Sequence, residues 1–197
     1  NPASPQAGAG AFALWRLGFR PFYVLGALFA ALGVPLWVAA FSGAISLPQG
    51  LPARTWHAHE MVFGFALAII TGFLFTAVRN WSNQPTPTGA HLAGLSAIWL
   101  AARIAFVAGA PNLGILIELI FLSLVAVALL RPLVRARNRR NYFVGVLFAV
   151  LAATDLLFWA AGQGLVGDVN PDSVVRFALY LVVTLTFVIG GRVIPMF

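Results

Sequence analysis

Six long apolar runs, separated by short polar or proline-rich stretches, dominate the sequence. Each run holds about 20 residues, the length at which an α-helix crosses ~30 Å of hydrocarbon. These runs lack the alternation of apolar and polar residues that a membrane β-barrel needs. We therefore predict an all-α fold, a polytopic bundle of about six transmembrane helices. The expected spans are 21–42, 56–79, 90–109, 112–131, 141–162 and 172–194.

The breaks between the runs consist of residues that end helices. Proline, glycine, serine and asparagine are frequent at 46–52 and 80–89, and the connection at 109–112 is short. The third and fourth spans should therefore be antiparallel neighbours. Residues 1–14, rich in proline, alanine and glycine, are expected to form a flexible arm, which leaves 15–197 as one transmembrane domain.

Composition supports the membrane prediction and argues against several functions. Apolar residues make up 61% of the chain and charged residues 9%, whereas soluble domains have about a quarter charged residues. Cysteine is missing, so any metal must be bound by histidine, carboxylate, methionine or backbone groups. The sequence has no phosphate-binding glycine loop, nucleophile elbow or catalytic triad, which argues against an ATPase or a hydrolase. It lacks an initial Met and a polar tail, so we expect it to be part of a longer protein.

The arginines predict how the chain lies in the membrane. Five of them fall between residues 131 and 140, so the positive-inside rule puts this loop in the cytoplasm. Six spans then place the N-terminus in the cytoplasm and the start of the second span on the outer side. This topology and anionic lipid explain the net charge of +7, so no nucleic acid is expected as a partner.

Residues 56–61 (WHAHEM) bring two histidines and an acid to the start of the second span. Ionisable groups are costly inside a membrane, which makes them functional candidates. At about 100° per residue, His57 and His59 point about 200° apart and cannot chelate one ion as a pair. His57 shares a helical face with Glu60, Gly64 and Gly72, a stripe that allows either close helix packing or room for the flat face of a porphyrin.

These residue types suit haem or copper chemistry. A neutral imidazole is an axial ligand of haem iron, and Glu60 could support it or hold copper together with His59. The alternative is that His57 and His59 only form hydrogen bonds to loop carbonyls at the interface. His91 begins the third span at the opposite end, so it cannot complete a haem site. A second axial ligand must then come from outside this chain, or the iron is five-coordinate.

Three further charged residues fall inside the spans at a common depth. Counting back from the outer helix ends at ~1.5 Å per residue puts Arg103, Glu118 and Asp155 roughly 10 Å below the outer boundary. Arg103 and Glu118 lie on adjacent antiparallel helices, so we predict that they form an ion pair. Asp155 is a polar relay for protons, a group that orients a cofactor, or a hydrogen-bonded structural acid.

Several short motifs in combination resemble those of a known family. They lie at residues 17–22 (LGFRPF), 56–61 (WHAHEM), 63–64 (FG), 72–78 (GFLFTAV), 80–81 (NW), 99–103 (WLAAR) and 190–195 (GGRVIP). With these motifs the chain resembles the NnrS proteins, bacterial haem- and copper-containing membrane proteins of the nitric oxide response. The resemblance implies haem b, with copper as a further metal, and a multi-pass location in the bacterial cytoplasmic (inner) membrane.

The resemblance also implies roles for particular residues. The leading candidates for metal or haem ligation are His57 and His59, and the candidate propionate or structural partners are Arg20, Arg103 and Arg192. Glu60, singled out above from its position, joins the two histidines as a candidate metal ligand. The chain would correspond to the first half of the family's length, so a second half or a partner membrane subunit would complete the site. The family often has Asn and His in the fifth span where this chain has Asp155 and Trp159, which would leave one ligand missing.

Three functions stay open at this point. The first is an NnrS-like haem and copper protein that protects against nitric oxide, with or without enzymatic turnover. The second is a non-catalytic accessory or scaffolding subunit of a respiratory or photosynthetic membrane complex, which the half-length resemblance and Trp159 favour. The third is a small-molecule or proton-coupled transporter that uses Arg103, Glu118 and Asp155 as a polar path, although paired mid-membrane helix breaks are missing.

Overall fold

The computed structural model describes residues 11–47 and 52–193, with side chains for 13–47 and 52–191. Every regular element in this part of the chain is a helix. Six helical segments there are long and apolar enough to cross a membrane, which confirms the predicted α-helical bundle and a multi-pass membrane protein in contact with lipid. In chain order the elements are α1 (Ala11–Leu14), α2 (Phe19–Phe41), α3 (Ala53–His59), η1 (Glu60–Ala66), α4 (Leu67–Ser82), α5 (Gly89–Val107), α6 (Pro111–Arg135), η2 (Arg139–Asn141), α7 (Phe143–Gly162) and α8 (Pro171–Val193).

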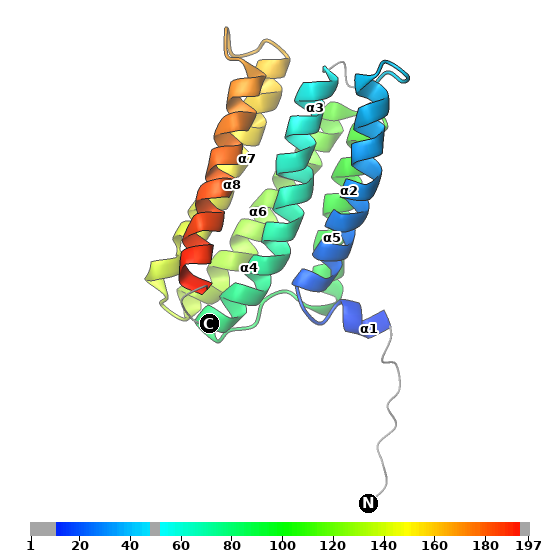
Figure 1. Ribbon diagram of the computed structural model, residues 1–197. Coiled ribbons are helices and arrows are strands. Elements are labelled where there is room, and N and C mark those ends of the chain that lie inside the picture. Colours follow the sequence, from blue (N-terminus) through cyan, green and yellow to red (C-terminus); the bar gives the residue numbers. More distant parts are fainter. Residues whose placement is uncertain (1–10, 48–51, 194–197) are drawn as a thin grey trace, which may run out of the picture.

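Successive spans run up and down the bundle (Figure 1). The two ends of the bundle differ in charge. The half that contains α3 holds all the acids of the chain, and we call it the acidic half: Glu60, Glu118, Asp155, Asp168 and Asp172. At the opposite end α4 and α6 stop and α5 and α7 begin. We call it the arginine-rich end, for Arg20, Arg79, Arg131, Arg135, Arg137, Arg139 and Arg140. That this end faces the cytoplasm remains a prediction from the arginine distribution.

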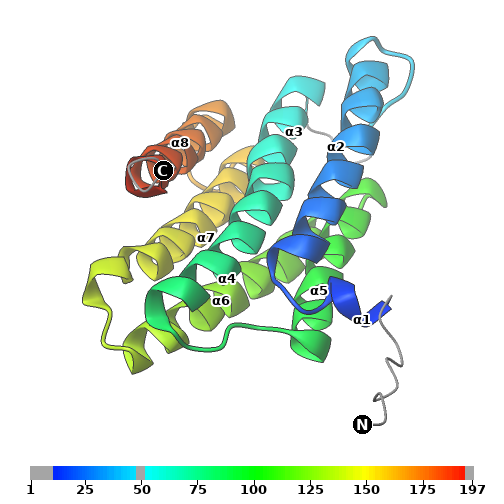
Figure 2. The ribbon, with the colours of Figure 1, turned by 60° about the horizontal axis from the view of Figure 1, so that its bottom comes forward.

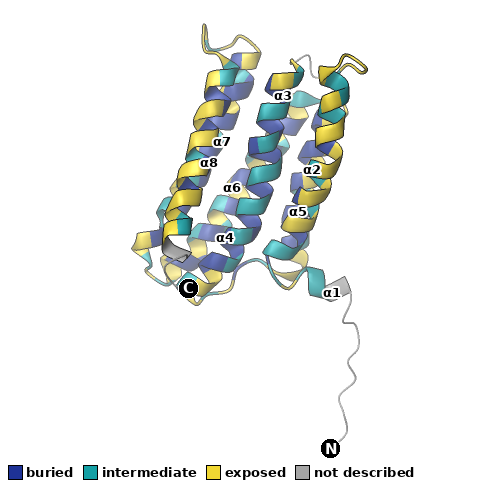
Figure 3. Ribbon diagram, in the orientation of Figure 1, coloured by how far each residue is buried: buried dark blue, intermediate teal, exposed yellow. Residues whose placement is uncertain are grey.

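The second span, made of α3, η1 and α4, occupies the centre of the bundle. In its most apolar window 61% of residues are buried, compared with 11% in α2 and 28% in α8. Figure 2 shows α8 on one side of this span and α2 with α5 on the other. The outward faces of α2 and α8 are exposed and apolar, as expected for helices that face lipid (Figure 3).

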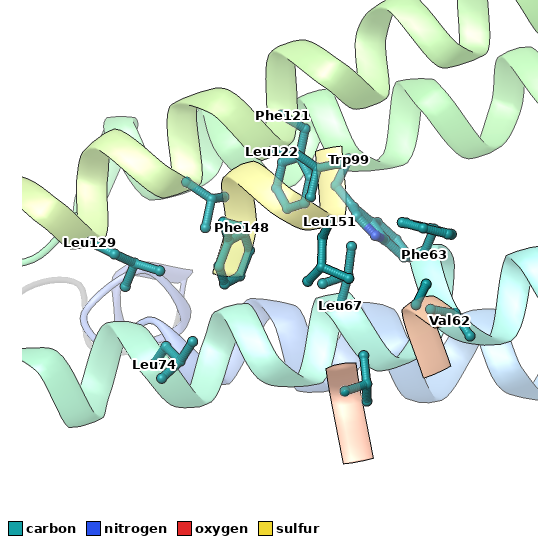
Figure 4. Packing of buried hydrophobic residues seen from close by; sticks show 14 of the residues in the cluster. Val62, Phe63, Leu67, Leu74, Trp99, Phe121, Leu122, Leu129, Phe148 and Leu151 are labelled. Carbon is teal, nitrogen blue, oxygen red and sulfur yellow. The ribbon is translucent and has the colours of Figure 1, made fainter. Parts of the chain in front are cut away.

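The apolar core lies between the second span and helices α5, α6 and α7. Leu67 and Phe63 of the second span meet Trp99 of α5, Leu122 of α6 and Leu151 of α7 in this layer (Figure 4). Each of these five side chains is almost completely buried. The core therefore holds four spans in fixed positions directly below the charged residues of the acidic half.

Local sequence explains several helix ends. Asn83 adopts a left-handed conformation with φ 51° and ends α4, a role that asparagine fills more readily than most residues. Gly109 has φ 78° in the turn between α5 and α6, where an L side chain would be strained. Pro111 then occupies the first turn of α6, where its missing N–H costs no hydrogen bond.

A polar contact fixes α8 against α3 at the end of the acidic half. The Nη2 of Arg54 donates to Oδ2 of Asp172 at 2.7 Å, and Oγ1 of Thr55 donates to Oδ1 of the same carboxylate at 2.8 Å. Asp172 lies in the first turn of α8, where its negative charge also interacts favourably with the helix dipole.

Two details of the helices differ from the expected spans. The fourth span continues past residue 131 to Arg135, with Pro132 inside the helix and buried. A proline is tolerated there because neighbouring helices and local adjustments can satisfy the freed backbone groups. The second span is not a continuous α-helix, because residues Glu60–Ala66 form a π-helix.

Candidate functional site

Five ionisable side chains form one buried cluster in the acidic half. His59 and Glu60 come from the second span, Arg103 from α5, Glu118 from α6 and Asp155 from α7. Each side chain is at most 3% exposed. Burying charge in a membrane protein is costly unless the groups pair with one another, so the partners of each residue decide what the cluster can do.

Arg103 is held by two carboxylates. Its Nη1 donates to Oε2 of Glu60 at 2.9 Å, and its Nη2 pairs with Oε1 of Glu118. The guanidinium carbon also lies 4.9 Å from the ring centre of Phe106, within cation–π range. The ion pair between Arg103 and Glu118 thus forms part of a larger network that also includes the second span.

His59 connects Glu60 to the carboxylates of Asp155 and Glu118. Its Nδ1 lies 3.2 Å from Oε1 of Glu60, and its Nε2 lies 2.8 Å from Oδ1 of Asp155 and 3.8 Å from Oε2 of Glu118. One ligand atom from each of His59, Glu118 and Asp155 falls within 4.8 Å of the others, a grouping that could hold a metal ion. The carboxylate of Glu60 at Nδ1 is placed to orient the imidazole, as in many metal sites.

Aromatic rings enclose the imidazole of His59. Phe63 and Phe158 stack on it, with centroids at 4.9 and 4.7 Å and interplanar angles of 28° and 24°. Phe106 and Trp159 meet it edge-on at 5.7 and 5.3 Å. This enclosure excludes water, strengthens the electrostatic interactions inside the cluster and leaves the carboxylates as the neighbours of the imidazole nitrogens.

The π-helix Glu60–Ala66 shapes this site. Single π-helical turns inside α-helices are frequent at functional sites. Here the carbonyl of Gly64 accepts a hydrogen bond from Nε1 of Trp99 at 3.2 Å. A Cβ on Gly64 would lie 2.7 Å from the ring of Phe29 and 3.1 Å from both Nη1 of Arg103 and Oε2 of Glu60, so only glycine lets the ion pair pass so close.

His57 lies apart from the cluster. Its imidazole stacks on Trp37 of α2 with centroids 4.0 Å apart and an interplanar angle of 17°. The side chain is half-buried, and its Nδ1 has no hydrogen-bond partner among the described residues. His57 and Glu60 lie three residues apart but contact different helices, since the imidazole stacks on Trp37 of α2 and the carboxylate pairs with Arg103 of α5.

The structure thus brings some of the predicted site residues together and separates others. His59, Glu60 and Arg103 share the cluster with Glu118 and Asp155. Arg20 lies at the opposite end of the bundle, where its Nη1 donates to the carbonyl of Ala13 at 2.7 Å. The side chain of Arg192 lies outside the described residues.

Sequence reasoning did not identify the group of His59, Glu118 and Asp155 as a set of ligands. The sequence signal was the common depth of Arg103, Glu118 and Asp155. Because the second span begins at Ala53, His59 lies about 9 Å along its helix, at a similar depth. The stacking of Phe63 and Phe158 on His59 was not anticipated either. Phe63 lies four residues after His59 on the same helix, which is the spacing of helical neighbours, and that signal could have been used.

Comparison with known proteins identifies a family. The family model described as NnrS protein matches residues 13–197, nearly the whole chain. No curated protein and no solved structure matches.

Proposed function

Because the chain belongs to the NnrS family, we propose that it is a bacterial inner-membrane protein that binds a metal ion at its buried cluster and acts in the response to nitric oxide. The observation that carries the proposal is the grouping of His59, Glu118 and Asp155, whose ligand atoms lie within 4.8 Å of one another. The metal and the nitric oxide role are those that the family resemblance implies.

The charge of the cluster supports a cation. The carboxylates of Glu60, Glu118 and Asp155 outnumber the guanidinium of Arg103 by two, so a divalent ion beside a neutral His59 would neutralise the cluster. Oε2 of Glu118 and Oδ2 of Asp155 are buried and have no hydrogen-bond partner among the described residues. Buried oxygens of this kind normally have a partner, and a metal ion is a suitable one.

The donor set also fits the implied metal. One imidazole nitrogen and two carboxylate oxygens suit copper(II), zinc, iron or manganese, with copper(II) the tightest in the usual order of affinity. The metal would supply redox or Lewis-acid chemistry in a site closed to water. Glu60 would orient the imidazole of His59 through Nδ1. The guanidinium of Arg103 would neutralise the one carboxylate charge that a divalent ion leaves unbalanced.

Haem fits less well at His59 than at His57. Phe63 and Phe158 cover both faces of the His59 imidazole, and its two nitrogens already face carboxylates. A porphyrin at His59 would have to displace this packing. His57 is half-buried and its Nδ1 is unpartnered among the described residues, so we propose it as the histidine for haem b.

Metal analysis of purified protein with matched histidine variants tests the proposal. We expect a bound transition metal in the wild type, and at least a tenfold weaker affinity in His59→Ala, since even residues that only support metal ligands contribute about 10–100-fold. His57→Ala should keep the metal but lose any Soret absorption. Protein that contains no metal, or His59→Ala that keeps it while eluting as a folded monodisperse species, would contradict the assignment.

The cellular role needs a separate test. Cells that lack this protein should be inhibited more strongly by a nitric oxide donor, and the wild type but not His59→Ala should restore growth. Equal sensitivity of deleted and complemented cells would rule out the nitric oxide role while leaving the metal site standing.

The other two hypotheses predict different results. A proton-coupled transporter would neutralise the excess negative charge of the cluster with protons, so it would contain no metal. Transport of its substrate would change the pH inside loaded vesicles. An accessory subunit would co-purify at fixed stoichiometry with a larger complex or with a chain that corresponds to the second half of the family's length. The exposed apolar face of α8, which includes Tyr180 and Phe187, is a surface that such a helical partner could cover.

A further inference from the structure

A groove separate from the cluster runs between α5 and α6 at the arginine-rich end. Its volume is about 540 Å³. Its walls are mostly apolar, and Pro85 and Pro87 of the loop before α5 border it. On α5, a Cβ added to Gly94 would meet nothing within 4 Å, so the groove is open at that position. The remaining apolar lining residues include Ile98, Leu124 and Val127.

Three basic side chains line the part of the groove nearest to the helix ends. They are His91 from the first turn of α5 and Arg131 and Arg135 from the last turns of α6. All three are exposed, and among the described residues neither arginine forms an ion pair. Every acid of the chain lies in the acidic half, so this rim has positive charge without a protein counter-charge.

The dimensions of the groove match one leaflet of a bilayer. From Leu124 to Arg135 the lining of α6 extends about 16 Å at 1.5 Å per residue, roughly half of the hydrocarbon thickness. The basic rim lies at the helix ends, where headgroups are found, and the apolar part lies toward the middle of the membrane. A small free anion would match only the rim, whereas an amphipathic anion would match the whole groove.

We propose that this groove is a specific binding site for an anionic phospholipid. The phosphate contacts Arg131, Arg135 and His91, and one acyl chain lies between α5 and α6 over Gly94. Basic pockets between transmembrane helices bind anionic headgroups in this way. The site is independent of the metal cluster, which lies in the other half of the bundle.

Native mass spectrometry of the full chain, released from nanodiscs of phosphatidylglycerol and phosphatidylcholine, tests the proposal. The wild type should retain phosphatidylglycerol preferentially. The double variant Arg131→Gln/Arg135→Gln should retain it about 100-fold less, because loss of each charge-assisted hydrogen bond to the lipid phosphate costs about tenfold. The matched variant Arg139→Gln/Arg140→Gln removes the same charge at the same end but outside the groove, and it should retain the lipid.

The apolar part of the groove has its own matched pair. Gly94→Leu should displace the acyl chain and lower retention, whereas Ala97→Leu, at an exposed position of α5 outside the groove, should not. Equal losses in the two arginine double variants would show attraction by surface charge alone and overturn the proposal. It would also be overturned if Gly94→Leu bound normally, or if millimolar glycerol phosphate displaced the lipid from the wild type.

Discussion

The buried cluster around His59 and the arginine-rich end hold charge under opposite conditions. In the cluster, Arg103 is 3% exposed and contacts two carboxylates, in surroundings made of aromatic rings. At the arginine-rich end, Arg131 and Arg135 are exposed and have no ion-pair partner among the described residues. The first arrangement depends on exact partners, and the second depends on the total charge near the membrane surface.

This difference separates what single substitutions should do in the two regions. A buried charge that loses its partner cannot be hydrated, so the cost falls on the folded state. An exposed arginine is solvated before and after a substitution nearby, so folding hardly changes and only association with lipid is affected. The cluster is therefore the place to test stability, and the arginine-rich end is the place to test surface interactions.

The largest effect is expected from Arg103→Met. It removes the guanidinium from the three carboxylates of the cluster, and breaking a buried pair in this way typically costs about 3–5 kcal/mol. Denaturant unfolding of the protein in detergent measures the loss. Arg135→Gln serves as the control and should leave the unfolding free energy unchanged, so equal behaviour of both variants would erase the contrast between the two regions.

A smaller effect is expected from Gly64→Ala beside the cluster. The added Cβ would meet Phe29 at 2.7 Å and crowd Arg103 and Glu60, and overpacking of this kind costs typically about 1–3 kcal/mol. Gly94→Ala is the matched change in α5, where the added Cβ meets nothing within 4 Å. It should raise helix stability by about 0.5–1 kcal/mol, and a loss at Gly94 as large as at Gly64 would contradict the close packing at Gly64.

The smallest effect is expected from Trp99→Phe. The change keeps an aromatic ring but removes the N–H that donates to the carbonyl of Gly64 at 3.2 Å in the π-helix. Loss of one such hydrogen bond costs about 1 kcal/mol, and the smaller ring adds a cost for the space it leaves in the buried layer. Thermal unfolding should report this decrease, and metal titration should show a weakened affinity. A change in stability without any change in metal affinity would show that the π-helix does not position the cluster.

The spans were predictable because a membrane permits few solutions. Every backbone group in hydrocarbon must be satisfied within the chain, so an apolar run of about 20 residues becomes a helix whatever its neighbours are. The family resemblance from short motifs is confirmed by the match over residues 13–197. Depth counted along helices also groups Arg103, Glu118 and Asp155, because antiparallel spans of similar length bring equal depths together.

Partner choice within the cluster was not predictable from spacing. The sequence places His57 and Glu60 on one helical face, but a shared face does not decide which neighbouring helix each side chain contacts. In the structure His57 stacks on Trp37, and Glu60 binds Arg103. Only the tertiary packing of α2 and α5 against the second span distinguishes these partners. The roles of His57, His59, Arg20 and Arg103 toward a cofactor therefore remain predictions.

The π-helix Glu60–Ala66 also sets the rotational phase between the two parts of one membrane span. A π-helical turn includes one residue more than an α-helical turn, so a regular α-helix through the same residues would rotate one part against the other by about 100°. Either His59 would then leave Asp155, or Leu67 would leave the core. The backbone geometry of these seven residues is consequently as constrained as their identity, although six of them are uncharged.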